Sequence, residues 1–118
     1  MTLYTRSIKE KPSKKDGVRI CIMRHPDKWA KYDIWMPQLS PSQKLRDEVK
    51  KGIGWAKFKV KFLKEMRKEV KFIDFVAGSA MKNNVTLLCV EDNPFYCHRS
   101  LLAKEIKKKY HKLKVMIR

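Results

Sequence analysis

Three consecutive residues, Cys97, His98 and Arg99, carry the side chains of this sequence that are best suited to chemistry. A thiol, an imidazole and a guanidinium stand next to one another, Ser100 follows them, and Glu91 lies a short distance upstream. The segment comes after an apolar run and before a helical pattern, and open α/β sheets bind their ligands at such strand ends. We therefore expect a functional site in this segment, and four interpretations of it are open.

The first interpretation makes Cys97 a nucleophile, because a thiol that starts a helix beside two cationic side chains is favoured as the thiolate. His98 need not be its base, since side chains of neighbouring helical residues do not share one face. The cysteine–loop–arginine spacing of phosphatases is absent, because neither Cys89 nor Cys97 is followed by arginine five or six residues later. Covalent catalysis also requires a positioned base, so whether the chain is an enzyme stays open.

The second interpretation is a metal site that combines Cys97 or His98 with His25 or Glu91. Adjacent cysteine and histidine residues rarely bind one ion together, and the sequence contains no set of tetrahedral ligands at the usual spacing. We therefore expect neither a metal nor another cofactor.

The third interpretation is a pocket for a small anion or a phosphate group. A helix N-terminus presents free N–H groups and a partial positive charge, to which Arg99, His98 and Ser100 add hydrogen-bond donors. Arg24 follows another predicted strand, so in a parallel sheet it would reach the same edge. Arg99 and Arg24 would hold the anion. His98 would donate or transfer a proton, and Glu91 would orient Arg99.

The fourth interpretation is purely structural. Glu91 would pair with Arg99, His98 would cap the helix, and Cys97 would fill a small buried space. Our working hypothesis is the third interpretation, with Cys97 as a redox-sensitive or nucleophilic thiol at the edge of the anion pocket.

Apolar periodicity and turn signals predict the elements that must position these residues. We expect strands over 2–8, 18–23, 85–90 and 113–117, and helices over 40–51, 55–78 and 100–110. Ser40 would cap the first helix, with Pro41 at its first position. Residues 27–39 are expected to be irregular or a short helix. The run over 85–90 is apolar almost throughout, which is typical of a strand covered on both faces.

This order of elements favours an α/β fold. We expect a single three-layer domain over residues 1–118, with a small, mainly parallel central sheet of the Rossmann-like kind. The segment from residue 85 to the last strand would form a right-handed βαβ crossover. A hydrophobic content of 43% is enough for a core and argues against a disordered chain.

The charge of the chain suggests a function of a different class. Lys+Arg is 29 and Asp+Glu is 12, which gives a net charge of +17, and 22 of the 29 cations are lysines. A lysine-dominated excess fits nonspecific attraction to phosphates better than reading of a DNA sequence. The alternative function is therefore nonspecific nucleic-acid binding through Lys107, Lys108, Lys109 and Lys112. A scaffold that meets an acidic partner is a further alternative.

The three cysteines, Cys21, Cys89 and Cys97, follow no CxxC pattern. No apolar run approaches the ~18 residues of a membrane span, and the N-terminus lacks the apolar stretch of a secretion signal. We therefore expect reduced thiols, a cytoplasmic location and no membrane partner. The oligomeric state stays open.

Several of these segments resemble a known family. Residues 85–89, VTLLC, and 97–103, CHRSLLA, resemble the signature of the domain of unknown function family 488. Residues 33–46 resemble the D-W … L-(A/S)-P-S-x-x-L-R stretch of its short, YeaO-like branch, and the DGVRI of 16–20 resembles the D-G-x-R-I/V strand of that branch.

The resemblance implies a compact α/β domain with a site at Arg24, Glu91, Cys97, His98 and Arg99, and it implies no established reaction. Two departures bear on that site. Met23 stands where the family usually has an aspartate before the arginine, so one acidic group is missing. The short branch usually loses the Cys-His-Arg motif, which this chain retains.

Overall fold

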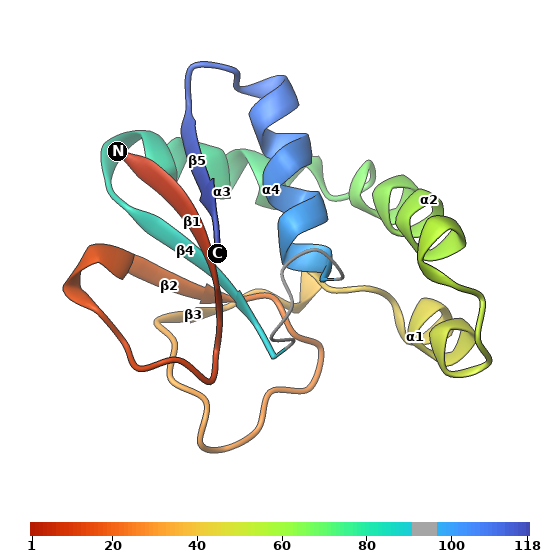
Figure 1. Ribbon diagram of the computed structural model, residues 1–118. Coiled ribbons are helices and arrows are strands. Elements are labelled where there is room, and N and C mark those ends of the chain that lie inside the picture. Colours follow the sequence, from red (N-terminus) through yellow and green to blue (C-terminus); the bar gives the residue numbers. More distant parts are fainter. Residues whose placement is uncertain (91–96) are drawn as a thin grey trace.

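Five parallel strands form one sheet in the part of the chain that the structure describes (Figure 1). The computed structural model describes residues 1–90 and 97–118. Its strands are β1 (Thr2–Ser7), β2 (Val18–Cys21), β3 (Ile34–Trp35), β4 (Val85–Cys89) and β5 (Lys114–Ile117). They lie in the order β3-β2-β4-β1-β5, and each pairing is parallel. The expected α/β fold with a parallel central sheet is confirmed.

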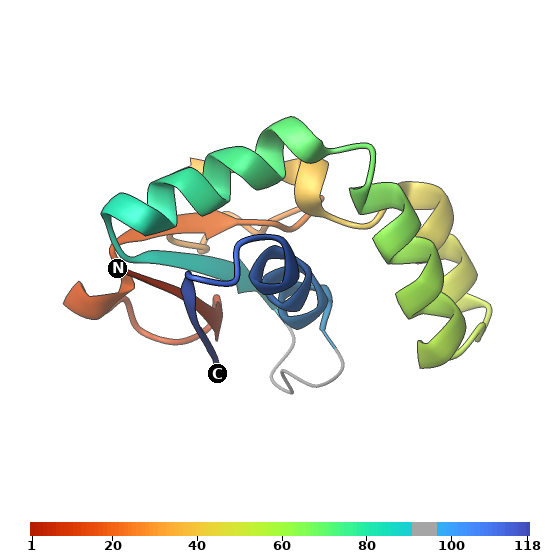
Figure 2. The same ribbon diagram turned by 90° about the horizontal axis from the view of Figure 1, so that it is seen from above.

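The connections between these strands carry the helices. The α-helices are α1 (Gln43–Lys50), α2 (Trp55–Met66), α3 (Val70–Lys82) and α4 (His98–Lys109), and the short 3-10 helices are η1 (Lys14–Asp16) and η2 (Pro37–Leu39). Helix α3 leads into β4, and α4 leads from β4 towards β5. Figure 2 shows α1 and α2 side by side at one end of the molecule, beyond the strands.

Side-chain alternation along the strands separates the two faces of the sheet. On one face Leu3, Ile20 and Leu87 are fully buried in the main core, together with apolar residues of all four α-helices. On the other face Cys21 and Leu88 belong to a smaller cluster, which residues of the adjoining connections cover. The helices, the sheet and these connections form the three layers. Every residue of β4 is buried, as its apolar run predicts.

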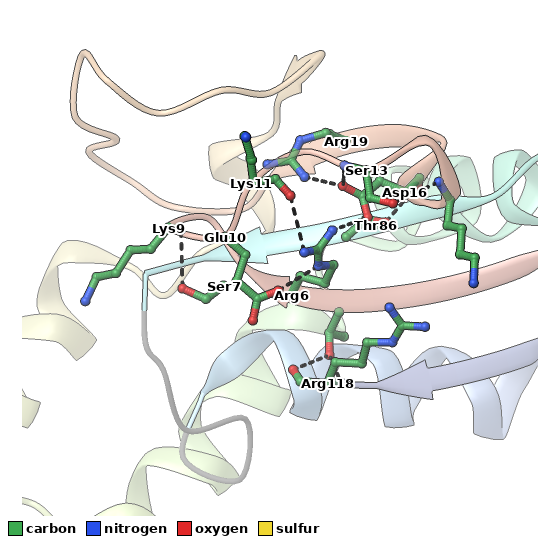
Figure 3. A network of polar contacts seen from close by, with 12 residues as sticks. Arg6, Ser7, Lys9, Glu10, Lys11, Ser13, Asp16, Arg19, Thr86 and Arg118 are labelled. Carbon is green, nitrogen blue, oxygen red and sulfur yellow. Dashed lines mark hydrogen bonds and ion pairs between the residues drawn. The ribbon is translucent and has the colours of Figure 1, made fainter.

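A buried ionic network fastens η1 to the second face of the sheet (Figure 3). The side chain of Asp16 is 2% exposed, and its carboxylate accepts hydrogen bonds from Arg6 at 2.6 Å and from Arg19 at 2.5 Å. The Ser13 N–H donates to the same carboxylate at 3.0 Å, and the Thr86 hydroxyl donates to the Asp16 carbonyl at 2.8 Å. One residue therefore links β1, β2 and β4 to the connection that covers them.

The long helix expected over 55–78 is wrong, because the chain turns between α2 and α3. The N–H groups of Lys68 and Glu69 donate to carbonyls only three residues earlier, and Glu69 has a non-helical backbone (φ −108°, ψ 36°). The turn allows Phe62 of α2 to meet α4 while Val76 of α3 packs in the core over the sheet. Both helices continue one apolar stripe, so periodicity did not reveal the turn.

Three smaller expectations are also corrected. Ser42, rather than Ser40, caps α1, since its hydroxyl accepts the Leu45 N–H at 3.1 Å. The segment 27–39, expected to be irregular or a short helix, contains the short helix η2 but also the strand β3, and a strand of two residues is too short for a periodic signal. Helix α4 begins at His98, two residues earlier than expected.

Candidate functional site

The end of β4 and the start of α4 bring two cysteines together. Strand β4 ends at Cys89, and Cys97 is the N-cap residue of α4. Both side chains are buried, and they are joined as a disulfide. The structure thus brings Cys89 and Cys97 together as a pair, whereas Cys21 is a free, buried cysteine. The two cysteines meet because α4 begins beside the end of β4. Their spacing in the sequence matches no CxxC motif, so the sequence did not predict this pairing.

Arg99 reaches this pair from the first turn of α4. Its side chain is 1% exposed, and its Nη1 donates to the Cys89 Sγ at 3.0 Å and to the Cys97 Sγ at 3.3 Å. Its Nη2 donates to the carbonyl of Arg118 at 3.5 Å. The guanidinium therefore faces buried sulfur atoms, where its positive charge favours negative charge on sulfur. The sequence had suggested a guanidinium that faces an open anion pocket.

His98 stands between the cysteine pair and β2. Its Nε2 lies 2.7 Å from the carbonyl oxygen of Ile22, which can only accept, so this nitrogen carries the hydrogen. In the neutral imidazole Nδ1 is then an acceptor, and it lies 4.0 Å from the Cys97 Sγ. The ring also meets Phe62 edge to face, with 5.6 Å between centroids. The imidazole and the thiol are thus neighbours in space as well as in sequence.

A cavity of about 540 Å³ opens beside His98, between α1, α2 and the connection after β2. Its wall includes Arg24, Arg46, Lys50, His98, Trp55 and Phe58. Three of these side chains are cationic, and no described lining residue carries a carboxylate. A concave surface lined by one sign of charge raises the local concentration of ligands of the opposite sign. The arrangement therefore suits an anion.

Of the other expected site residues, only Arg24 lies in the described cavity wall. Arg24 lies in the cavity wall, where its Nε donates to the Pro41 carbonyl at 2.9 Å. Ser100 is 3% exposed and lies in the first turn of α4, outside the described lining. Glu91 lies outside the described residues, so its role in orienting Arg99 stays a prediction.

Two cations of the cavity wall, Arg46 and Lys50, were missed from the sequence. They are four residues apart in α1, and that spacing places them on one face of a helix. The four-residue spacing is visible in the sequence, but no neighbouring residue in the sequence indicates that this face of the helix would lie beside His98. That juxtaposition depends on how α1 and α2 pack beside the start of α4.

A comparison with protein families matches residues 3–110 to DUF488-N3a, described as the active DUF488-N3 subclade. The chain belongs to the DUF488 family. The match runs from β1 to the end of α4 and so includes all the elements of the site. It confirms the resemblance seen in the VTLLC and CHRSLLA segments. Neither the curated proteins nor the solved structures gave a match.

The lysines near the C-terminus of this DUF488 protein make contacts within the chain. Lys107 donates to the carbonyls of His111 at 2.7 Å and Leu113 at 2.5 Å, beyond the end of α4. Lys108 and Lys109 form ion pairs with acidic residues of α4 and α3. The Lys107 contacts tie the end of α4 to the turn that leads into β5, and they give Lys107 a structural role. None of the described helices is long and apolar enough to cross a membrane.

Proposed function

We propose that this DUF488 protein binds a small anionic ligand, with a phosphate group as the best fit, in the cavity beside His98. The observation that carries the proposal is the charge of the cavity wall. Arg24, Arg46 and Lys50 line it, and no described lining residue carries a carboxylate. Arginine matches the geometry of phosphate through paired hydrogen bonds, and lysine adds a positive point charge.

The start of α4 supports the same ligand class. His98 is the first residue of this helix and lines the cavity, so the positive end of the helix dipole adjoins the bound anion. Trp55 and Phe58 add apolar surface to the wall. A ligand that combines an anionic group with an apolar portion would therefore bury both parts.

The neighbouring Cys-His-Arg group supports an enzymatic role rather than binding alone. In this proposal Arg24 and the cations of α1 hold the anion, and His98, whose Nδ1 faces Cys97, accepts the proton of that thiol when the cysteine pair is reduced. Cys97 lies directly behind His98, and Arg99 stabilises negative charge on its sulfur. The matched family model is described as the active DUF488-N3 subclade, which supports an activity for this chain without locating it.

Titration with inorganic phosphate tests the proposal. In ¹H–¹⁵N NMR spectra recorded at about 0.15 M salt, where long-range attraction is screened, the amides of α1 and of the start of α4 should shift saturably. The double variant Arg46→Met/Lys50→Met should weaken the apparent affinity by about tenfold or more, because it removes two of the charges that hold the anion.

The double variant Lys57→Met/Lys59→Met is the matched control. It also removes two positive charges, but from exposed positions of α2 that lie outside the described lining. Equal weakening in the two variants would show that phosphate responds only to the net charge. Spectra in which His98 and α1 do not shift at all would also reject the cavity as the binding site.

A further inference from the structure

We infer that Cys89 and Cys97 form a reversible thiol–disulfide pair, a two-electron redox centre whose co-substrate is a small thiol or disulfide. The inference concerns the buried sulfur atoms and does not depend on anion binding in the cavity. Only these two of the three cysteines meet, through the end of β4 and the start of α4.

Arg99 is the first reason to regard the pair as reducible. The sulfur atoms of a disulfide are neutral, whereas a reduced pair can carry thiolate charge 3.0–3.3 Å from the Arg99 Nη1. Because the guanidinium is 1% exposed, water screens this attraction only weakly. Arg99 therefore stabilises the reduced form more than the oxidised form, and stabilising the reduced form makes a disulfide a better oxidant.

Helix α4, like Arg99, stabilises the reduced form of the cysteine pair. Cys97 is the N-cap of this twelve-residue helix, and the partial positive charge of a helix N-terminus favours a thiolate. The Nδ1 of His98 lies 4.0 Å from the Cys97 Sγ. In its neutral form this nitrogen can accept the proton that the Cys97 thiol releases.

Cys21 provides a contrast within the same chain. It lies at the end of β2 and is a free, buried cysteine. Burial raises the pKa of its thiol, and the hydrogen bond from the Met23 N–H only partly opposes that effect. A buried thiol in apolar surroundings is inert, so Cys21 is a reference for a cysteine without redox function.

The exchange step with a small dithiol balances in two stages. The thiolate of the dithiol attacks the Cys97 Sγ, the bond between the two cysteines breaks, and Cys89 leaves as a thiolate that Arg99 stabilises. The second thiol of the reductant then attacks its own sulfur bound to Cys97, which releases Cys97 and the cyclic disulfide of the reductant. The protons of the two attacking thiols pass to the cysteines or to water.

The cavity adjoins the residues next to the cysteine pair. Val90 and His98 line it, and they adjoin Cys89 and Cys97 in the chain. Cys89 and Cys97 themselves are buried and lie outside the described lining, so a thiol in the cavity reaches them only when these neighbouring residues move. Exchange is expected to be faster for small thiols than for a protein thiol, which the cavity does not admit.

Redox titration of the full chain carrying Cys21→Ala tests the inference. The protein is equilibrated in glutathione buffers, quenched with acid and alkylated in denaturant, and its thiols are counted by mass spectrometry. We expect both cysteines to be oxidised together in the most oxidising buffer and both to be reduced in the most reducing buffer. Circular dichroism should show a folded chain at both ends.

Substitution of Arg99 tests its part in the redox equilibrium. Arg99→Met should shift the equilibrium towards the disulfide by about tenfold, because the reduced pair loses its cation. Arg99→Lys keeps the charge and should restore most of this shift. Arg67→Met removes the same kind of side chain from an exposed position at the end of α2 and should change the equilibrium by less than about twofold.

Several results would overturn the inference. A stoichiometric zinc ion in the purified chain would make the two cysteines metal ligands, and unfolding on reduction would make the disulfide structural. Folded Arg99 variants with an unchanged equilibrium would exclude the role of the guanidinium. If Arg99→Met does not fold, the Cys89→Ser chain gives a second measurement. Its Cys97 should react with iodoacetamide as a thiolate well below about pH 8.5, and ordinary thiol behaviour would reject the proposal.

Discussion

The carboxylate of Asp16 shows how a single residue fastens a connection to the sheet. Burial alone would raise its pKa, but hydrogen bonds from the Ser13 N–H, Arg6 and Arg19 outweigh burial and hold the pKa below the ordinary value of 3.8. Because the pKa is depressed in the folded state, the stabilisation is complete above about pH 4. It is lost as the pH falls through the folded value.

Asp16→Asn retains the shape of this side chain but removes the anion that Arg6 and Arg19 share. We expect the free energy of unfolding at neutral pH to fall by about 3 kcal/mol, as for other buried ion pairs that lose one partner. The difference between the two proteins should shrink below about pH 4, where the carboxyl of the unfolded chain takes up a proton first, and should vanish once the pH falls below the depressed native pKa. Urea denaturation at a series of pH values measures both effects.

Glu10→Gln is the control for this prediction. Glu10 pairs with the same Arg6 at 2.7 Å, but its side chain is half exposed. Exposed ion pairs contribute about 0–1 kcal/mol, so this variant should lose less than about 1 kcal/mol. Equal losses in the two variants would contradict the importance of burial and of the shared arginines.

At the scale of elements, the start of β2 depends on a glycine. Gly17 has a φ of +62°, and a Cβ atom at this position would lie 1.9 Å from the Asn84 carbonyl oxygen. The neighbouring Val18 N–H donates to that same oxygen at 2.9 Å. The entry to β2 and the entry to β4 therefore approach too closely for any side chain.

Gly17→Ala should destabilise the protein by more than about 2 kcal/mol, because it adds both a backbone strain and a clash with main-chain atoms. Gly52→Ala is the matched control. Gly52 also has a positive φ, of +87°, but nothing lies within 4 Å of its Cβ position, so only the conformational cost of about 1 kcal/mol remains. Thermal unfolding of the two variants measures the difference, and equal costs would reject the argument from close approach.

The pair of helices α1 and α2 determines where the cavity cations lie. The Ser42 N–H donates to Glu65 Oε1 at 2.9 Å, and the Ser42 hydroxyl donates to the other oxygen of the same carboxylate. Because Ser42 also caps α1, this contact ties the start of α1 to the end of α2. The face of α1 that carries Arg46 and Lys50 is thereby held towards the cavity.

At the scale of the whole molecule, a net charge of +17 opposes compaction through self-repulsion. We expect the melting temperature to rise by a few degrees when sodium chloride increases from about 10 mM to about 200 mM, because the Debye length then falls below about 10 Å. Differential scanning calorimetry measures the change.

A variant with fewer charges serves as the comparison. Replacing the exposed Lys57 and Lys59 of α2 by glutamate lowers the net charge by four units, so the rise with salt should be smaller. A melting temperature that does not change with salt, or changes equally in both proteins, would show that self-repulsion is unimportant. The same dependence on salt means that nucleic-acid binding seen only at low ionic strength would report charge alone.

The sequence by itself determined the fold class, most of the elements and the family. The apolar run of β4, the alternating strands at the chain ends and the helix after Arg99 were all predictable, because periodicity and turn residues act locally. The same local information located the Cys-His-Arg motif at the end of β4. It could not reveal the turn at Lys68 and Glu69, since the apolar stripe continues across it.

Only the tertiary structure decided which residues meet. It paired Cys89 with Cys97, turned Arg99 inward onto both sulfur atoms, and brought Arg46 and Lys50 to the cavity beside His98. The physical reason is that residue type and spacing limit the chemistry that a side chain can perform, whereas its partners depend on packing between segments that lie far apart in the chain.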